Sequence, residues 1–139
     1  MFNKDFTLEG LNEFSKKSMV GHIGIEITEI GDDFIKAKMP VDHRTIQPMG
    51  LLHGGASVVL AETLGSIGST MLTDINKQSC VGLEINANHI KSAKEGFVYG
   101  TAKPIHIGKR THVWEIKVSN DNNDLVCISR ITIAIIDRK

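Results

Sequence analysis

The chain has 139 residues, of which 41% are hydrophobic and 23% are charged, and its 16 basic residues balance its 16 acidic ones. This length predicts a single globular domain over residues 1–139. The composition excludes a disordered or fibrous chain, and the neutral balance argues against a nucleic-acid partner or a protein that coats anionic membranes.

The first half of the chain predicts a helix, a hairpin and a second, longer helix. Residues 7–17 space Leu8, Leu11 and Phe14 three apart, which indicates a short amphipathic helix. Residues 22–30 and 34–41 alternate apolar with smaller or polar side chains around a GDD turn and predict a β-hairpin. After a loop over residues 42–52, a Gly- and Ala-rich run that is too long for a strand predicts a central helix beginning near Gly54 or Gly55.

The second half predicts four strands, over residues 79–90, 97–107, 111–119 and 125–136. Because short turns separate these stretches, we expect an antiparallel meander. The complete order predicts an α+β architecture in which one helix faces a single curved sheet. Such a sheet leaves an edge strand and one face for a partner subunit, so an oligomer is expected.

Cellular location and cofactors are predicted from what the sequence lacks. The N-terminus has no apolar core of signal-peptide length, and no stretch has the uncharged apolar length of a membrane span, so we expect a cytoplasmic protein with no membrane partner. Cys80 and Cys127 lie in predicted strands and are expected to be free thiols. The six histidines follow no spacing typical of metal ligands, so no metal and no other cofactor is predicted.

Glu62 is the only formally charged side chain between residues 49 and 66. An unpaired buried carboxylate is costly, so Glu62 caps a backbone group, pairs with Arg44 or Arg130, or serves a functional site. Helical spacing places five residues on one face, which can border a cavity: Gly55, Val59, Glu62, Ser66 and Ser69.

The tripeptide His53-Gly54-Gly55 stands where the central helix is predicted to begin. Glycines there let a ligand approach backbone N–H groups that have no partner within the helix, and such a terminus can hold a developing oxyanion. The tripeptide also suits an ordinary Gly-rich junction. Gly55 and Glu62 are about 10 Å apart along one helix, so a site that uses both would take them from two chains.

Residues 86–112 contain five basic side chains and one acidic side chain, a net charge of +4. We therefore expect one part of the surface to favour anions. The side chains counted are Lys91, Lys94, Lys103, Lys109, Arg110 and Glu95.

Short motifs spread over nearly the whole chain resemble a known family. They include QP at residues 47–48, GLLHGG at 50–55, LAETLGS at 60–66, NA at 86–87 and WEI at 114–116. In these motifs the chain resembles the hotdog-fold acyl-CoA thioesterases of the phenylacetate and 4-hydroxybenzoyl-CoA type. Within that family it is similar to bacterial 1,4-dihydroxy-2-naphthoyl-CoA hydrolase-like proteins of menaquinone synthesis and to related aryl- and acyl-CoA hydrolases.

The resemblance implies that the chain hydrolyses an acyl-CoA thioester to a free acid and CoA, in a homodimer that commonly pairs into a homotetramer. It implies that Glu62 is the catalytic carboxylate, either as a general base for water or as a nucleophile. The N–H of Gly55 would polarise the thioester carbonyl, and Gln47 and His53 would hold that carbonyl or the water. Ser66 would line the acyl pocket.

The resemblance also implies a set of residues that grip coenzyme A and overlap the basic segment. These are Gly82, His89, Ile90, Lys91, Ser92, His106, Ile107, Gly108, Lys109, Arg110 and Thr111. Lys91, Lys109 and Arg110 are the candidates for the nucleotide phosphates.

Two other functions stay open at this point. A hotdog dehydratase would need a histidine placed as a base across the acyl chain, whereas His53 is followed at once by two glycines. A non-catalytic module that binds acyl-CoA would need the basic segment but not Glu62.

Overall fold

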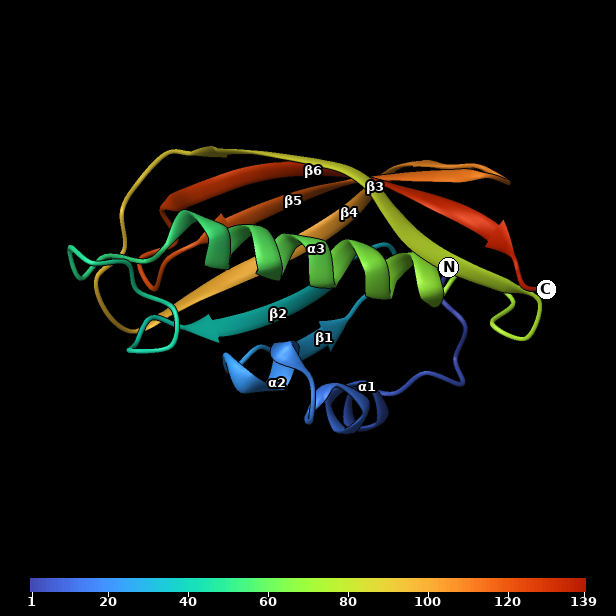
Figure 1. The fold of residues 1–139 in the computed structure, drawn as a ribbon, viewed down its shortest axis with the longest axis horizontal. Coiled ribbons are helices and arrows are strands. Elements are labelled where there is room, and N and C mark those ends of the chain that lie inside the picture. The colour runs from blue at the N-terminus through green and yellow to red at the C-terminus, as the bar shows by residue number, and fades with distance from the viewer.

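The Gly- and Ala-rich segment forms the longest helix, α3 (Gly54–Thr70), in a computed structural model that describes residues 1–139. Leu60 and Leu64 on one side of α3 are fully buried. A Cβ at Gly68 would come within 2.7 Å of the Trp114 ring, so this glycine lets the helix lie close to the sheet. Figure 1 shows α3 crossing one face of the sheet.

The sheet has six antiparallel strands in the order β1-β2-β4-β5-β6-β3. Their bounds are β1 (Glu26–Ile30), β2 (Ile35–Pro40), β3 (Gln78–His89), β4 (Phe97–Ile107), β5 (Thr111–Ser119) and β6 (Leu125–Asp137). Apolar side chains alternate along the central strands and join α3 in a core of 22 buried residues. This arrangement is the predicted α+β hotdog fold.

The predicted meander of four strands is wrong in one respect, because β3 pairs with β6 and not with β4. The segment between β3 and β4 is no tight turn. The N–H of Ile90 still bonds to β6 at Val126, 2.8 Å away, and the carbonyl of Ala93 accepts from Leu52 at 2.8 Å. The chain therefore crosses the start of α3, and β3 becomes an edge strand of the sheet.

The N-terminal residues pack beside β1. Helix α1 (Leu8–Ser15) lies where predicted and is capped by Thr7, whose side chain accepts from Gly10. Its Asn12 side chain exchanges two hydrogen bonds, of 2.9 and 2.8 Å, with the backbone of Ile27. The predicted strand over residues 22–30 begins only at Glu26, because a short helix α2 (Met19–His22) precedes it.

Three further side chains complete the comparison with the sequence. Cys127 is buried and Cys80 is half-buried, and both are free thiols as predicted. Ser69, one of the five residues predicted to share a helix face with Glu62, is fully buried and accepts a hydrogen bond from the Trp114 indole. No helix has the length and apolar character needed to cross a bilayer.

Candidate active site

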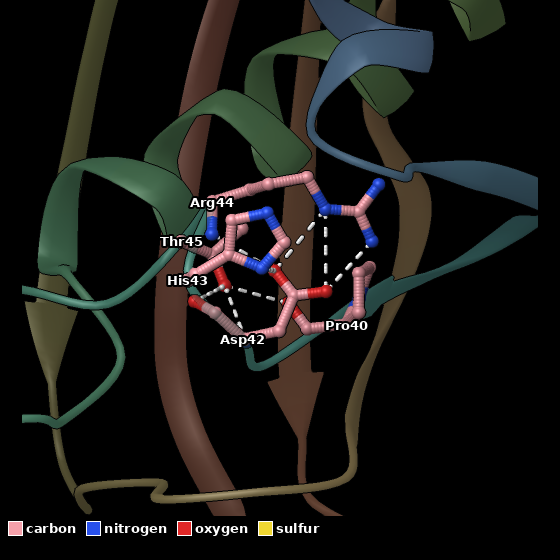
Figure 2. A network of polar contacts seen from close by, with 5 residues as sticks. All are labelled: Pro40, Asp42, His43, Arg44 and Thr45. Atoms are coloured by element: carbon pink, nitrogen blue, oxygen red, sulfur yellow. Dashed lines mark hydrogen bonds and ion pairs between the residues drawn. The ribbon is translucent and has the colours of Figure 1, made fainter.

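The loop that leads into α3 is held by hydrogen bonds around Thr45 (Figure 2). The buried Thr45 hydroxyl donates to the carbonyl of Pro40 at 2.7 Å and accepts from the N–H of Asp42 at 3.1 Å. The Arg44 guanidinium folds over Asp42, 2.7 Å from Oδ2, and lowers the pKa of that carboxyl to about 2. Because the Thr45 carbonyl accepts from the N–H of His53 at 2.8 Å, this loop fixes where α3 begins.

His53 caps the first turn of α3. Its Nδ1 accepts a hydrogen bond of 2.8 Å from the N–H of Gly55, the group that the sequence assigns to the thioester carbonyl. Since Nδ1 is the acceptor, a neutral imidazole carries its proton on Nε2. Both residues are exposed in the single chain. A carbonyl oxygen that binds this N–H must therefore displace the imidazole.

A cavity of 290 Å³ lies beside this helix terminus. It brings together Gln47 and four residues predicted to grip coenzyme A, which are His89, Ile90, Lys91 and Ser92. The His89 ring packs on the first turn of α3, where a Cβ at Gly54 would lie only 2.9 Å from it. Gln47 Oε1 accepts from the N–H of Met49, and no hydrogen bond takes up the Gln47 amide hydrogens.

Glu62 lies two turns further along α3, on the side of β3. A Cβ at Gly82 in β3 would be 2.7 Å from Glu62 Oε1, so any other residue at position 82 would shift the carboxylate from this place. The suggested ion pairs with arginine are not formed: Arg44 binds Asp42, and Arg130 is an exposed residue of β6 without an acidic partner.

The carboxylate of Glu62 makes no hydrogen bond to its own chain, although the side chain is half-buried. Every fully buried side-chain oxygen or nitrogen has a partner, so the Glu62 oxygens reach solvent. Ser66, one turn on, uses its backbone carbonyl to accept from Thr70 at 2.9 Å, and its hydroxyl has no partner. Glu62 and Ser66 therefore present unpaired polar groups on the same flank of α3.

The second predicted coenzyme A segment lies elsewhere. Ile107, Gly108, Lys109 and Arg110 line a cavity of 430 Å³ beyond the C-terminal end of α3, and Figure 1 shows the β4–β5 turn at the end of the sheet opposite the start of α3. The 11 residues of β4 separate the two segments by about 36 Å.

Residues 86–112, with their net charge of +4, therefore form two separate basic sites in one chain. The sequence predicted a single basic patch. The charges of the two sites are also partly paired. Lys91 lies 2.8 Å from Asp124, and Arg110 lies 3.3 Å from Asp137, whereas Lys109 has no acidic partner.

Two features of the site were missed from the sequence. The first is the loop network, although Asp42 followed three residues later by Thr45 is a pattern that often closes such turns. The second is the contact between Gly82 and Glu62. Nothing local to the sequence around Gly82 indicates that contact, because it depends on β3 lying at the sheet edge.

Comparisons with known proteins agree with this geometry. Residues 49–127 match the thioesterase superfamily. The 1,4-dihydroxy-2-naphthoyl-CoA hydrolase of Escherichia coli (strain K12) is 51% identical over 98% of this chain and 99% of its own. A mutant thioesterase from Pseudomonas aeruginosa, 45% identical, superimposes with a TM-score of 0.97 over 99% of both chains.

A Staphylococcus aureus protein adds a detail about the site. Two of its structures superimpose with TM-scores of 0.85 and 0.82, at 45% and 46% identity, and cover 87% and 84% of this chain and 100% and 97% of theirs. One carries alanine in place of a glutamate and the other in place of a glutamine. Those two positions are fifteen residues apart, as are Gln47 and Glu62.

The fold and these relatives define a hotdog-fold thioester hydrolase. The chain belongs to the thioesterase superfamily.

Replacing Thr45 tests how the loop positions the helix terminus. Thr45→Val keeps the shape but leaves the carbonyl of Pro40 and the N–H of Asp42 without their partner, which costs about 1–3 kcal/mol of unfolding free energy. Because the carbonyl of Thr45 also accepts the hydrogen bond from the N–H of His53, we expect turnover to fall as well. Urea unfolding and steady-state kinetics measure both, and Thr45→Ser, which keeps the hydroxyl, is the control. A Thr45→Val variant that keeps full activity would show that the loop does not position the site.

Proposed function

We propose that this thioesterase hydrolyses acyl-CoA thioesters, with aromatic acyl groups favoured, and that Glu62 is its catalytic carboxylate. The observation that carries the proposal is the unpaired Glu62 carboxylate, which is half-buried yet reaches solvent beside Gly82. A carboxylate in that state is available to accept a proton or to attack a carbonyl carbon. The matching glutamine and glutamate spacing in the Staphylococcus aureus protein supports the same pair of residues.

The reaction needs three groups around the thioester. As a general base, Glu62 takes a proton from water while the water oxygen attacks the carbonyl carbon. The N–H of Gly55 binds the oxyanion that forms, and the intermediate then expels the thiolate of CoA. As a nucleophile, Glu62 would attack the same carbon and expel the thiolate of CoA, and water would then hydrolyse the resulting mixed anhydride to the free acid and Glu62. The Gln47 amide and the Nε2–H of His53 are the donors available to orient the carbonyl or the water.

A complete site needs two chains. Gly55 and Glu62 are held about 10 Å apart by one rigid helix, so they cannot act on one atom within a chain. The free edge of β3 offers the means of association, since it exposes Val81 and Leu83 by 42% and 62%. Antiparallel pairing of two β3 edges would bring Glu62 of one chain towards the start of α3 in the other.

The same homodimer would also unite the two coenzyme A segments. Residues 89–92 lie at one end of the chain and residues 106–111 at the other, and two-fold symmetry places opposite ends of the partners side by side. Acyl-CoA is thus the proposed substrate of a shared site, in the cytoplasm where such esters occur. We propose that two dimers associate into a tetramer, which the family resemblance supports.

The acyl group proposed is aromatic. The name of the Escherichia coli relative, 1,4-dihydroxy-2-naphthoyl-CoA hydrolase, supports that ester as a candidate and thereby a step of menaquinone synthesis. Initial rates over a panel of aromatic, long-chain and short-chain CoA esters would rank the acyl groups.

Glu62→Gln removes the proposed base while keeping the size of the side chain. We expect kcat to fall by about 10²–10⁴-fold, with folding and CoA binding nearly unchanged. Steady-state assays, thermal melts and CoA titrations separate these effects. The control is Glu29→Gln, since Glu29 is an exposed carboxylate on β1. Turnover retained by Glu62→Gln would leave Glu62 without a catalytic role, whereas a wild-type protein that binds CoA without turnover would favour the acyl-CoA binding module.

Lys109→Ala tests the nucleotide end of the proposed site. Lys109 is exposed and has no acidic partner, so its charge is available for phosphate. We expect KM for a CoA ester to rise by about tenfold, the value of one charge-assisted contact, and KM for the matching pantetheine ester to stay constant. Lys103→Ala, at an exposed lysine of β4, is the control. Equal effects on both esters would exclude Lys109 from phosphate binding.

A further inference from the structure

A row of buried, hydrogen-bonded side chains connects α3 to the β4–β5 turn. It consists of Ser69 on α3 with Trp114 and His112 on β5, which are 0%, 0% and 3% exposed. Ser69 Oγ lies 2.9 Å from the indole nitrogen of Trp114 and 3.0 Å from Nδ1 of His112. Three polar side chains in an apolar core are costly unless each has a hydrogen-bond partner, so the geometry of this hydrogen-bonded row is closely defined.

The hydrogen bond of the indole has one possible direction. An indole nitrogen only donates, so the Ser69 oxygen accepts from Trp114. The second hydrogen bond joins the Ser69 hydroxyl and Nδ1 of His112, and the tautomer of the imidazole decides which of the two donates. Burial lowers the pKa of His112, and the nearby His106 acts in the same direction, whereas a hydrogen bond with the backbone of Gly108 opposes them. His112 is therefore neutral at physiological pH.

The other side of His112 faces the turn between β4 and β5. His112 lines the 430 Å³ cavity together with Gly108, Lys109 and Arg110, and the backbone of Gly108 is close enough to the imidazole to influence its pKa. Leu72 and Thr73, which follow α3, line the same cavity. The imidazole thus stands between the end of α3 and the turn.

We propose that Ser69 and His112 are positioning residues that fix the Gly108–Arg110 turn relative to α3, so that the nucleotide end of the substrate is bound at a set distance from the acyl group. The proposal rests on the proposed function, because Lys109 and Arg110 act there as phosphate ligands. Neither Ser69 nor His112 touches the reacting atoms. Their loss should weaken nucleotide binding and leave the chemical step alone.

The test compares two esters of one acid. Benzoyl-CoA carries the nucleotide, and the benzoyl thioester of N-acetylcysteamine does not. For Ser69→Ala we expect KM for benzoyl-CoA to rise by about five- to tenfold, with kcat unchanged and with both constants for the short ester unchanged. The Kd for CoA, measured by calorimetry, should rise by the same factor.

Two variants of His112 separate its contact with Ser69 from its contact with the turn. His112→Asn can still reach Ser69 but not Gly108, and His112→Gln can reach the turn but not Ser69. Because the coupling needs both contacts, each variant should raise KM for benzoyl-CoA, and adding Ser69→Ala to either should raise it no further. These variants also keep the test valid if Ser69→Ala does not fold.

Ser129→Ala is the matched control. Ser129 is a buried serine of β6 whose hydroxyl donates to the carbonyl of Asn86 at 2.8 Å, far from the turn. Its loss should lower the melting temperature and leave KM unchanged. An equal rise in KM for both esters, or the same rise in Ser129→Ala, would overturn the proposal. The row of Ser69, Trp114 and His112 would then only stabilise the fold.

The calorimetric arm distinguishes this proposal from the proposed function. A wild-type protein that binds CoA but hydrolyses neither ester would contradict the hydrolytic function, while the Kd values of the variants would still decide the role of Ser69 and His112. A wild-type protein that does not bind CoA would overturn both.

Discussion

One rigid helix sets the distance on which the proposed chemistry depends. Gly55 and Glu62 belong to the same α3, and the rise of the helix keeps the two residues about 10 Å apart along its axis. The proposed reaction therefore takes the two groups from different chains. The unpaired carboxylate, the capped helix terminus and the free edge of β3 are the features that support this proposal.

Neighbouring residues hold each of the two groups of the proposed site in place. Thr45 and its loop determine where α3 begins, and the glycine at position 82 gives the carboxylate of Glu62 its place beside β3. The imidazole of His53 competes with substrate at the helix terminus, since its Nδ1 accepts the hydrogen bond from the N–H of Gly55 until another acceptor replaces it. Substrate binding is thus expected to exchange one hydrogen bond for another, and the helix terminus is never left without a partner.

The sequence predicts those features that depend on local pattern. The long helix, its start at the HGG tripeptide and the position of Glu62 within it follow from composition and spacing, and the strands lie within a residue or two of their predicted bounds after residue 30. Long-range contacts were not predictable in this way. The pairing of β3 with β6, the burial of Ser69 against Trp114 and the separation of Lys91 from Lys109 all depend on which strands become neighbours, and short connecting segments do not specify that.

A dimer with two different subunits tests the shared site most directly. One subunit carries Glu62→Gln and the other Gln47→Ala, and distinct affinity tags isolate the mixed dimer after co-expression. If Glu62 of each chain works with Gln47 and Gly55 of its partner, one site of the mixed dimer has both mutations and the other has none. The account predicts about half of the wild-type activity per dimer, from parents that are nearly inactive. A mixed dimer no more active than its parents would show that each site is built within one chain, which contradicts the account.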